Sequence, residues 1–323
     1  MKTFARLVFC VLVISIASIQ LFSRPVRAEE GQKAVLVTGA STGIGRNIAE
    51  KLAADGHFVY AGARKADDIA ALSAIDNVQG VRLDVTFQEE IDAAVQLVAD
   101  GGRGLYAVVN NAGVNVVGPL IEIEEAELDF LFDVNIYGPY RITKSFAPMI
   151  IESKGRIVNI SSISGTLSGP LYGIYSMSKH ALEAYTDSLA WEMEALDVKV
   201  IGVEPGNFKS KIGDTRCERL LAQGYSAQGS YFEDRVSRML DNCKNRPENT
   251  GAEPDAVSAA VAHALFDAKP KQHYLVVPEQ EEAEWTAWKA IEEVVNLNHG
   301  HAYSYSREEL IEMLDELMAE MEK

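Results

Sequence analysis

Residues 33–45 read KAVLVTGASTGIG, and the rest of the predicted fold follows from them. Residues 33–38 are apolar and rich in β-branched side chains, which predicts a buried strand. The glycine-rich turn after this strand leads into a helical pattern from Ile44 to about Asp55. A strand, a tight turn and a helix in this order form the first unit of an α/β sheet, and the free N–H groups at the start of such a helix can bind phosphate.

Each glycine of this turn has its own predicted role. Gly39 permits the tight turn, Gly43 lets the backbone approach a pyrophosphate, and Gly45 lets the helix pack closely on the strand. The turn therefore predicts a dinucleotide site formed by Gly39, Ser41, Thr42, Gly43, Ile44 and Gly45.

Strands and helices alternate along the following chain. Further strands are predicted at residues 57–62, 78–83, 105–110, 156–161, 198–203 and 273–277. Helices are predicted at 88–99, at 123–150 with an interruption near Gly138 and Pro139, at 172–195 and at 254–268, whereas residues 206–247 look less regular and are expected to cover the site. This alternation predicts an α/β fold, a Rossmann-type doubly wound parallel sheet in a single domain of residues 31–278.

Both ends of the chain are expected to lie outside this domain. Residues 1–28 place Lys2 and Arg6 before an apolar run at 7–22, which fits a signal peptide cleaved after Ala28 or an uncleaved membrane anchor. The protein is therefore expected to be membrane-associated through residues 7–22, or exported or luminal. Residues 279–323 are predicted to form an acidic helical C-terminal tail, with helical patterns around 285–288 and 310–317 that we interpret as packing and a solvated acidic face.

Composition limits the class of function. The net charge of −17 argues against binding to nucleic acid, which needs clustered Lys and Arg. The three cysteines do not form a disulfide framework; we interpret Cys217 and Cys243 as free thiols, with pairing in an oxidising compartment as the alternative. His299 and His301 lack matching ligands and are interpreted as loop residues, so no metal site is predicted.

A second informative segment, residues 162–179, reads SISGTLSGPLYGIYSMSK. Tyr175 and Lys179 are four residues apart and share one face of the predicted helix. The ammonium of Lys179 is expected to lower the pKa of the Tyr175 phenol from its usual value of about 10, so that the phenol can exchange a proton with an alcohol oxygen. Ser162 follows the strand before it, at the edge of the sheet where such folds place their sites.

The end of the second strand reads AGARK at residues 61–65, with no acid before Asp67. An acidic residue at this position usually binds the ribose 2′-hydroxyl of NAD, whereas Arg64 can bind the 2′-phosphate of NADP. We therefore favour NADP(H) as cofactor, with NAD(H) as the alternative. Asp84 follows the third strand and is expected to meet the adenine ring.

Taken together, these motifs resemble those of the classical short-chain dehydrogenase/reductase family over about residues 33–277, and among its members those acting on retinoids and steroids. Thr42 stands where many NADP-preferring members have a basic residue, and Ser210 where a Thr is usual. The matching positions are Thr38, Gly39, Gly43, Gly45, Asn110, Asn111, Ala112, Gly113, Asn135, Ser162, Tyr175, Lys179, Pro205, Gly206 and Ser210.

The resemblance implies hydride transfer between a nicotinamide and an alcohol, ketone or aldehyde. Tyr175 would be the general acid/base, Lys179 would assist it and bind the nicotinamide ribose, Ser162 would hold the substrate oxygen, and Asn135 would hold a water that links Lys179 to solvent. Beyond the glycine turn, the expected cofactor-binding residues are Arg64, Asp84, Val85, Asn111, Ala112, Gly113, Tyr175, Lys179, Pro205, Gly206 and Ser210.

Two other interpretations remain open at this point. A chain of this kind could be a non-catalytic dinucleotide-binding sensor or scaffold, although the complete set of Ser162, Tyr175 and Lys179 argues against it. Epimerase or dehydratase chemistry is disfavoured by the glycine spacing of the first turn. The expected partners are a small alcohol or carbonyl substrate, which the resemblance suggests is lipophilic, and a second copy of the chain in a homodimer or homotetramer.

Overall fold

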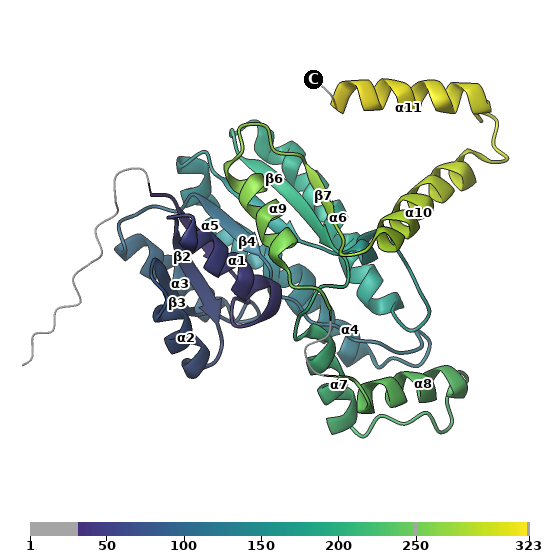
Figure 1. The fold of residues 1–323 in the computed structure, drawn as a ribbon, viewed down its shortest axis with the longest axis horizontal. Helices are drawn as coiled ribbons and strands as arrows, with labels where there is room; N and C mark the ends of the chain where they lie inside the picture. Colours follow the sequence, from purple (N-terminus) through teal and green to yellow (C-terminus); the bar gives the residue numbers. More distant parts are fainter. Residues whose placement is uncertain (1–31, 248–250, 322–323) are drawn as a thin grey trace, which may run out of the picture. The chain divides into compact units, whose positions relative to one another are not determined.

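The computed structural model describes residues 32–247 and 251–321. Seven parallel strands form one sheet in the order β3-β2-β1-β4-β5-β6-β7, which confirms the predicted doubly wound fold (Figure 1). The reversal of strand order between β1 and β4 opens a crevice at the carboxyl ends of these strands. The strands are β1 (Ala34–Val37), β2 (Phe58–Ala63), β3 (Val78–Arg82), β4 (Ala107–Asn110), β5 (Arg156–Ile160), β6 (Lys199–Pro205) and β7 (His273–Val276).

Helices connect these strands and continue beyond them. They are α1 (Gly43–Ala54), α2 (Ala66–Ser73), α3 (Gln88–Asp100), α4 (Glu125–Phe132), α5 (Gly138–Glu152), α6 (Gly173–Glu194), α7 (Ile212–Ala222), α8 (Glu233–Lys244), α9 (Asp255–Phe266), α10 (Gln280–Asn298) and α11 (Arg307–Met321). The two acidic patterns expected in the C-terminal tail correspond to α10 and α11.

The sheet is buried on both faces because alternate side chains of each strand enter different cores. On β1, Val35 and Val37 pack with α1 and α9, whereas Leu36 packs with α3, α5 and α6 on the opposite face. Continuous apolar strands are expected for a parallel sheet covered by helices on both sides. This arrangement fixes the carboxyl ends of the strands, and therefore the loops that carry the site.

The segment 206–247 is more regular than predicted. It contains α7 and α8, and a disulfide joins Cys217 of α7 to Cys243 of α8, so the interpretation of these cysteines as free thiols is wrong. The two residues pack with Val117 and Leu220 in a small separate core. The pairing depends on the side-by-side packing of two helices, which cysteine spacing alone does not reveal. The short helix α2 was also not predicted.

The predicted interruption of the long helix at 123–150 has a structural counterpart. A π-helical turn, Asp133–Tyr137, separates α4 from α5, and Pro139 lies in the first turn of α5. Proline has no N–H to donate to a preceding turn, so an irregular turn before it is expected. The irregular turn places Asn135 in the protein interior.

The predictions for residues 1–28 fall outside the described residues. Within residues 32–247 and 251–321, none of the helices combines the length and apolar character needed to cross a membrane.

Candidate active site

The turn after β1 is closed by contact with the segment after β4. Gly39 has a φ of +64°, and a Cβ built on it would lie 2.8 Å from the Cα of Ala112. A side chain at this position would therefore meet both backbone strain and a clash with another backbone. A Cβ on Gly45 would overlap the carbonyl oxygen of Gly39 and the side chain of Asn111, so α1 begins directly against the turn, as predicted.

Hydrogen bonds hold the same two segments together. The Thr38 hydroxyl accepts from the N–H groups of Asn111 and Ala112, both at 3.0 Å. The Asn111 side-chain amide donates to the carbonyl oxygens of Thr38 and Gly39, at 2.9 and 3.1 Å. The glycine turn and the Asn-Asn-Ala-Gly segment therefore form one unit, although they are far apart in the sequence.

Ser162, Tyr175 and Lys179 converge at the carboxyl end of β5. Ser162 ends the extended strand and accepts a hydrogen bond from the Ser164 N–H at 3.1 Å. Tyr175 and Lys179 lie in the opening turns of α6, as predicted, with the Lys179 Nζ 5.8 Å from the centre of the Tyr175 ring. The Lys179 ammonium donates to the carbonyl oxygen of Ile160 at 3.0 Å, which fixes it beside the end of β5.

The pKa of the Tyr175 phenol does not move in the expected direction. Burial raises the pKa of Tyr175 to about 12, although a hydrogen bond with Ser162 acts to lower it. Burial also lowers the pKa of Lys179 to about 8, against the opposing effect of Glu183. The predicted lowering of the Tyr175 pKa is therefore contradicted, because the effect of burial exceeds that of the hydrogen bond with Ser162.

Asn135 lies in the π-helical turn and is buried. Its side chain accepts from the Val114 N–H at 2.9 Å and donates to the Val114 carbonyl at 3.0 Å and to the Ser178 hydroxyl at 3.1 Å. Asn135 thus ties the segment after β4 to α6, next to Lys179. Its role in holding a water for proton transfer stays a prediction.

One cleft of about 1070 Å³ brings most of the predicted residues together. Gly43 and Asn135 are not among its lining residues; a Cβ on Gly43 would instead lie 3.1 Å from the Cα of Ser210, so its close backbone neighbour is Ser210. The predicted residues that line the cleft are Gly39, Ser41, Thr42, Ile44, Gly45, Arg64, Asp84, Val85, Asn111, Ala112, Gly113, Ser162, Tyr175, Lys179, Pro205, Gly206 and Ser210.

Arg64 and Asp84 border the cleft where β2 and β3 end. The Arg64 side chain is 66% exposed, and its Nη1 lies 3.6 Å from Asp84 Oδ2. Asp84 also accepts hydrogen bonds from the N–H and hydroxyl of Thr86. The guanidinium therefore remains accessible to an anion in the cleft, at the expected end of the site.

The cleft also includes residues that the sequence analysis did not select. Several are apolar or aromatic, and two of them, Val114 and Phe130, pack in one cluster with Tyr175. No local signal distinguishes them, because they come from segments that meet only in the folded chain. They include Val114, Phe130, Leu167, Tyr172, Asn207, Phe208 and Trp285.

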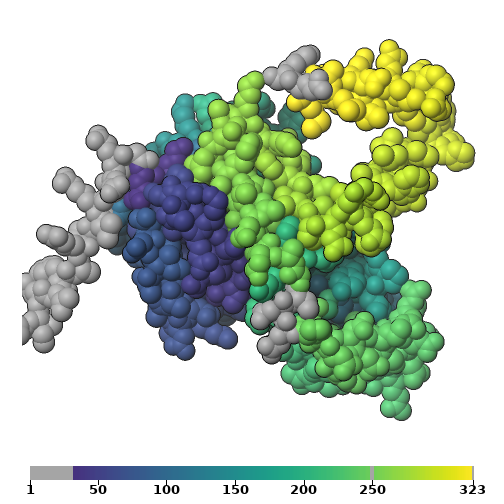
Figure 2. Space-filling model, in the orientation of Figure 1, coloured from purple at the N-terminus to yellow at the C-terminus, as the bar shows by residue number. Residues whose placement is uncertain are grey.

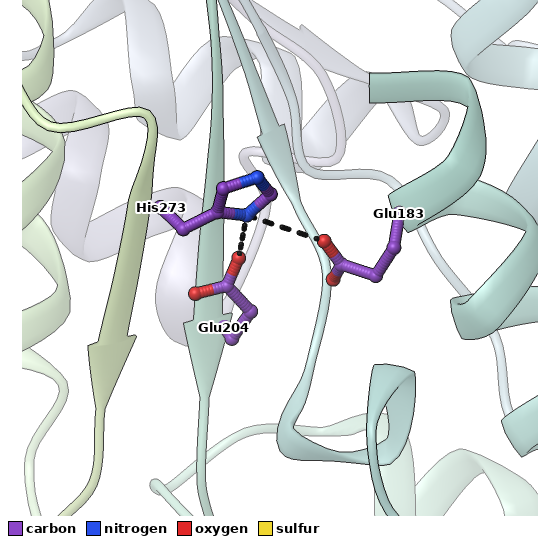
Figure 3. A group of neighbouring side chains, drawn as sticks. All are labelled: Glu183, Glu204 and His273. Atoms are coloured by element: carbon purple, nitrogen blue, oxygen red, sulfur yellow. Dashed lines mark hydrogen bonds and ion pairs between the residues drawn. The ribbon is translucent and has the colours of Figure 1, made fainter. Parts of the chain in front are cut away.

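A charged cluster joins the side chains of Glu183, Glu204 and His273 (Figure 3). His273 Nδ1 is 2.8 Å from Glu204 and 3.5 Å from Glu183, and its Nε2 is 2.8 Å from Asp187. Hydrogen bonds to Glu183, Glu204 and Asp187 raise the pKa of His273 to about 11. Atoms of Glu183, Glu204 and His273 lie within 4.8 Å of one another, close enough to share a metal ion, but the raised pKa favours a protonated ion pair that joins α6, β6 and β7.

Comparison with curated proteins finds relatives across most of the chain. D-β-hydroxybutyrate dehydrogenase of Bos taurus mitochondria is 34% identical over 269 residues, covering 76% of each chain. Retinol dehydrogenase 7 of Rattus norvegicus is 32% identical, covering 78% of this chain and 82% of its own. The 3-ketodihydrosphingosine reductase of Bacteroides thetaiotaomicron is 32% identical, covering 73% of this chain and 84% of its own.

Solved structures share the fold. A short-chain dehydrogenase/reductase from Burkholderia phymatum in complex with NAD has a TM-score of 0.69 and 25% identity, covering 85% of this chain and 98% of its own. A short-chain dehydrogenase from Burkholderia cenocepacia in complex with NADP has a TM-score of 0.63 and 22% identity, covering 82% of this chain and 95% of its own. The family model for short chain dehydrogenases matches residues 33–221, more than half of the chain. The chain therefore belongs to the short-chain dehydrogenase family.

Proposed function

We propose that the protein is an NAD(P)(H)-dependent oxidoreductase that interconverts an alcohol and its ketone or aldehyde. The observation that carries this proposal is that Ser162, Tyr175 and Lys179 line the same cleft as the glycine turn. A substrate at Tyr175 would then share one enclosed space with a dinucleotide held at the start of α1. The names of the related dehydrogenases and reductases agree with this reaction class.

The cleft fits a dinucleotide. Its volume of about 1070 Å³ exceeds that of many small-molecule sites. At the start of α1 the N-cap residue Thr42 makes no side-chain capping bond, so the first N–H groups of the helix are available to a phosphate. Two structures of related fold hold NAD and NADP, which supports a nicotinamide dinucleotide in this chain.

Residues of the chain supply the proton and the positioning, while a bound nicotinamide would supply or accept the hydride. With its pKa raised to about 12, the Tyr175 phenol is protonated at neutral pH and can donate to a carbonyl oxygen, the step that reduction requires. Ser162 can hold the same oxygen by a hydrogen bond. Lys179 is fixed by the Ile160 carbonyl and lies one helical turn from Tyr175.

NADP(H) is the proposed cofactor, with NAD(H) as the alternative. The support is Arg64, an exposed guanidinium at the cleft edge where the ribose is expected. A guanidinium can bind a 2′-phosphate with two parallel hydrogen bonds. Its partner Asp84 lies 3.6 Å away, too far for a short hydrogen bond, so Arg64 can turn toward a ligand.

A lipophilic alcohol or carbonyl compound is the proposed substrate class. Val114 and Phe130 line the cleft and pack in one cluster with Tyr175, and Leu167 adds to the apolar lining. The related retinol dehydrogenase and 3-ketodihydrosphingosine reductase bear names of lipophilic substrates. Apolar walls bind such a substrate by removing its hydrocarbon surface from water.

Two locations are proposed, anchoring to a membrane through residues 7–22 or export after cleavage at Ala28. The disulfide between Cys217 and Cys243 supports an oxidising compartment for the folded domain. Sequencing the N-terminus of the protein purified from its cell distinguishes the two. A homodimer or homotetramer stays a prediction, and measurement of the molar mass in solution tests it.

The test of the proposed reaction follows nicotinamide absorbance with NADP(H) and NAD(H) and a panel of lipophilic ketones and alcohols. The change Tyr175→Phe is expected to lower kcat by about a thousandfold or more, because it removes the proton donor. Dinucleotide binding, measured by calorimetry, should be retained. A Tyr175→Phe protein that keeps most of its turnover would contradict the proposal, whereas turnover of no compound by wild-type protein that binds dinucleotide favours the non-catalytic sensor.

A further inference from the structure

The helix α10 carries a buried carboxylate that contacts the loop after β6. Glu282 is only 6% exposed, and it accepts from the backbone N–H of Asn207 at 3.0 Å and from the Asn207 side-chain amide at 2.6 Å. A Cβ on Gly206 would overlap the Glu282 carboxylate, so this glycine leaves room for it. Both carboxylate oxygens therefore have a partner in the same loop.

That loop forms part of the cleft. Pro205, Gly206, Asn207 and Phe208 all line it. The loop is also held by a hydrogen bond from the Gly206 N–H to the Val276 carbonyl at 2.8 Å. The hydrogen bonds from Asn207 to the Glu282 carboxylate are charge-assisted and therefore stronger than neutral hydrogen bonds. If Asn207 moved away, the buried carboxylate would lose its partners, at a cost in free energy. The position of the loop thus depends on a residue 75 positions away in the sequence.

The same helix brings an aromatic side chain into the cleft. Trp285 lies three residues after Glu282, on a neighbouring part of the helix face, and it lines the cleft while remaining 53% exposed. The start of α10 directly follows β7 and lies against the body of the domain (Figure 2). Since β6 adjoins β5, and Ser162 follows β5, this is the end of the cleft with Ser162 and not the end with Arg64.

We propose that α10 completes the dinucleotide site: Glu282 is a positioning residue that holds the loop at residues 205–208, and Trp285 covers the nicotinamide end. This inference rests on the proposed function. We interpret the tail as packing and a solvated acidic face; the start of α10 does pack, with Glu282 and Thr286 buried, and the inference adds a role at the site. The half-exposed indole offers an apolar surface that a bound nicotinamide would remove from water. A dinucleotide would then order α10 and the loop together.

The first experiment measures NADP⁺ and NAD⁺ binding by calorimetry in full-length protein. Glu282→Ala is expected to raise the dissociation constant for the preferred dinucleotide about tenfold, because the loop loses the two hydrogen bonds between Asn207 and Glu282. Glu282→Gln keeps one acceptor oxygen and should restore most of the affinity. Glu281→Ala, an exposed neighbour on the same helix, is the matched control and should bind as wild type. Unchanged affinity in a folded Glu282→Ala protein overturns the positioning role.

The second experiment uses Trp285 as a reporter that does not depend on turnover. The chain has three tryptophans, so Trp191→Phe with Trp288→Phe leaves Trp285 alone, and Trp191→Phe with Trp285→Phe leaves Trp288 alone. A saturating amount of the dinucleotide that binds more tightly should reduce acrylamide quenching of Trp285 by about twofold or more, since bound ligands are largely enclosed. Trp288, 74% exposed and outside the cleft lining, should change little.

The outcomes separate this inference from the proposed function. If the dinucleotide binds but does not reduce acrylamide quenching of Trp285, or reduces that of Trp288 equally, the proposed role of α10 is overturned and the proposed function stands. No binding of either NADP⁺ or NAD⁺ to wild-type protein overturns the proposed function and this inference together. If Glu282→Ala does not fold, the single-tryptophan reporters still decide whether α10 contributes to the dinucleotide site.

Discussion

The two ends of the cleft are built in different ways. At one end, the turn after β1 depends on Gly39, whose φ of +64° and contact with Ala112 exclude other residues. At the other end, the loop after β6 is held by an ordinary polar pair, Glu282 and Asn207. A site is visible in a sequence when backbone geometry demands a particular residue type. Side-chain pairs between distant segments carry no such signal.

The largest effect is expected from Gly39→Ala, which tests the turn. Adding a Cβ at φ +64° and 2.8 Å from a backbone carbon should destabilise the fold by about 3 kcal/mol or more and weaken dinucleotide binding over about a hundredfold. The measurements are chemical denaturation and calorimetry. Gly102→Ala is the control, because Gly102 has the same φ and a Cβ added there would meet no atom within 4 Å. Similar binding losses in both variants would show that the contact with Ala112 is unimportant.

The next largest effect is expected from the disulfide that joins α7 to α8. Replacing Cys217 and Cys243 by Ser should lower the free energy of unfolding by about 3 kcal/mol, because the bridge closes a loop between positions 26 residues apart. Denaturation of the wild-type protein with and without a thiol reductant measures the same effect. The reductant should not change the free energy of unfolding of the serine variant. If the reductant does not change the free energy of unfolding of the wild-type protein either, the bridge does not form in solution.

A smaller effect is expected from Arg64→Ala at the adenosine end of the cleft. Loss of the exposed guanidinium should raise the dissociation constant for NADP⁺ by about tenfold, since it removes charge-assisted hydrogen bonds to a phosphate. NAD⁺ lacks that phosphate and serves as the internal control, with an expected change below about twofold. Equal losses for both dinucleotides would remove the argument for NADP.

The smallest effect is expected from His273→Gln, and it depends on pH. The pKa of His273 is raised to about 11, so its contribution to stability is complete below about 6.5, the value for an unfolded His, and is lost as the pH rises toward 11. For a partly exposed ion pair the loss at pH 6 should be about 1 kcal/mol. Denaturation at pH 6 and pH 9 measures it, with His299→Gln in an exposed turn as control. A loss of stability in His273→Gln that is larger at pH 9 than at pH 6 would contradict the raised pKa of His273.

Much of the fold and of the site could be predicted because the signals were local. The apolar strands, the glycine turn and the pair Tyr175 and Lys179 each depend on neighbours within a few residues. The pKa of Tyr175 could not be predicted, because burial depends on what covers the side chain. The helix α8 was missed although Val236, Leu240 and Cys243 have helical spacing and are buried, which a closer reading of periodicity could have found.

Local sequence was enough to predict the seven strands, the glycine turn after β1 and the placement of Tyr175 and Lys179 on one helix face, because glycine at positive φ and an i, i+4 pair are requirements of local backbone geometry. The pairing of Cys217 with Cys243 and the contact of Glu282 with Asn207 became visible only in the folded chain. These contacts arise when helices and loops pack around the completed sheet. Their energies depend on burial and distance, which no short stretch of sequence contains.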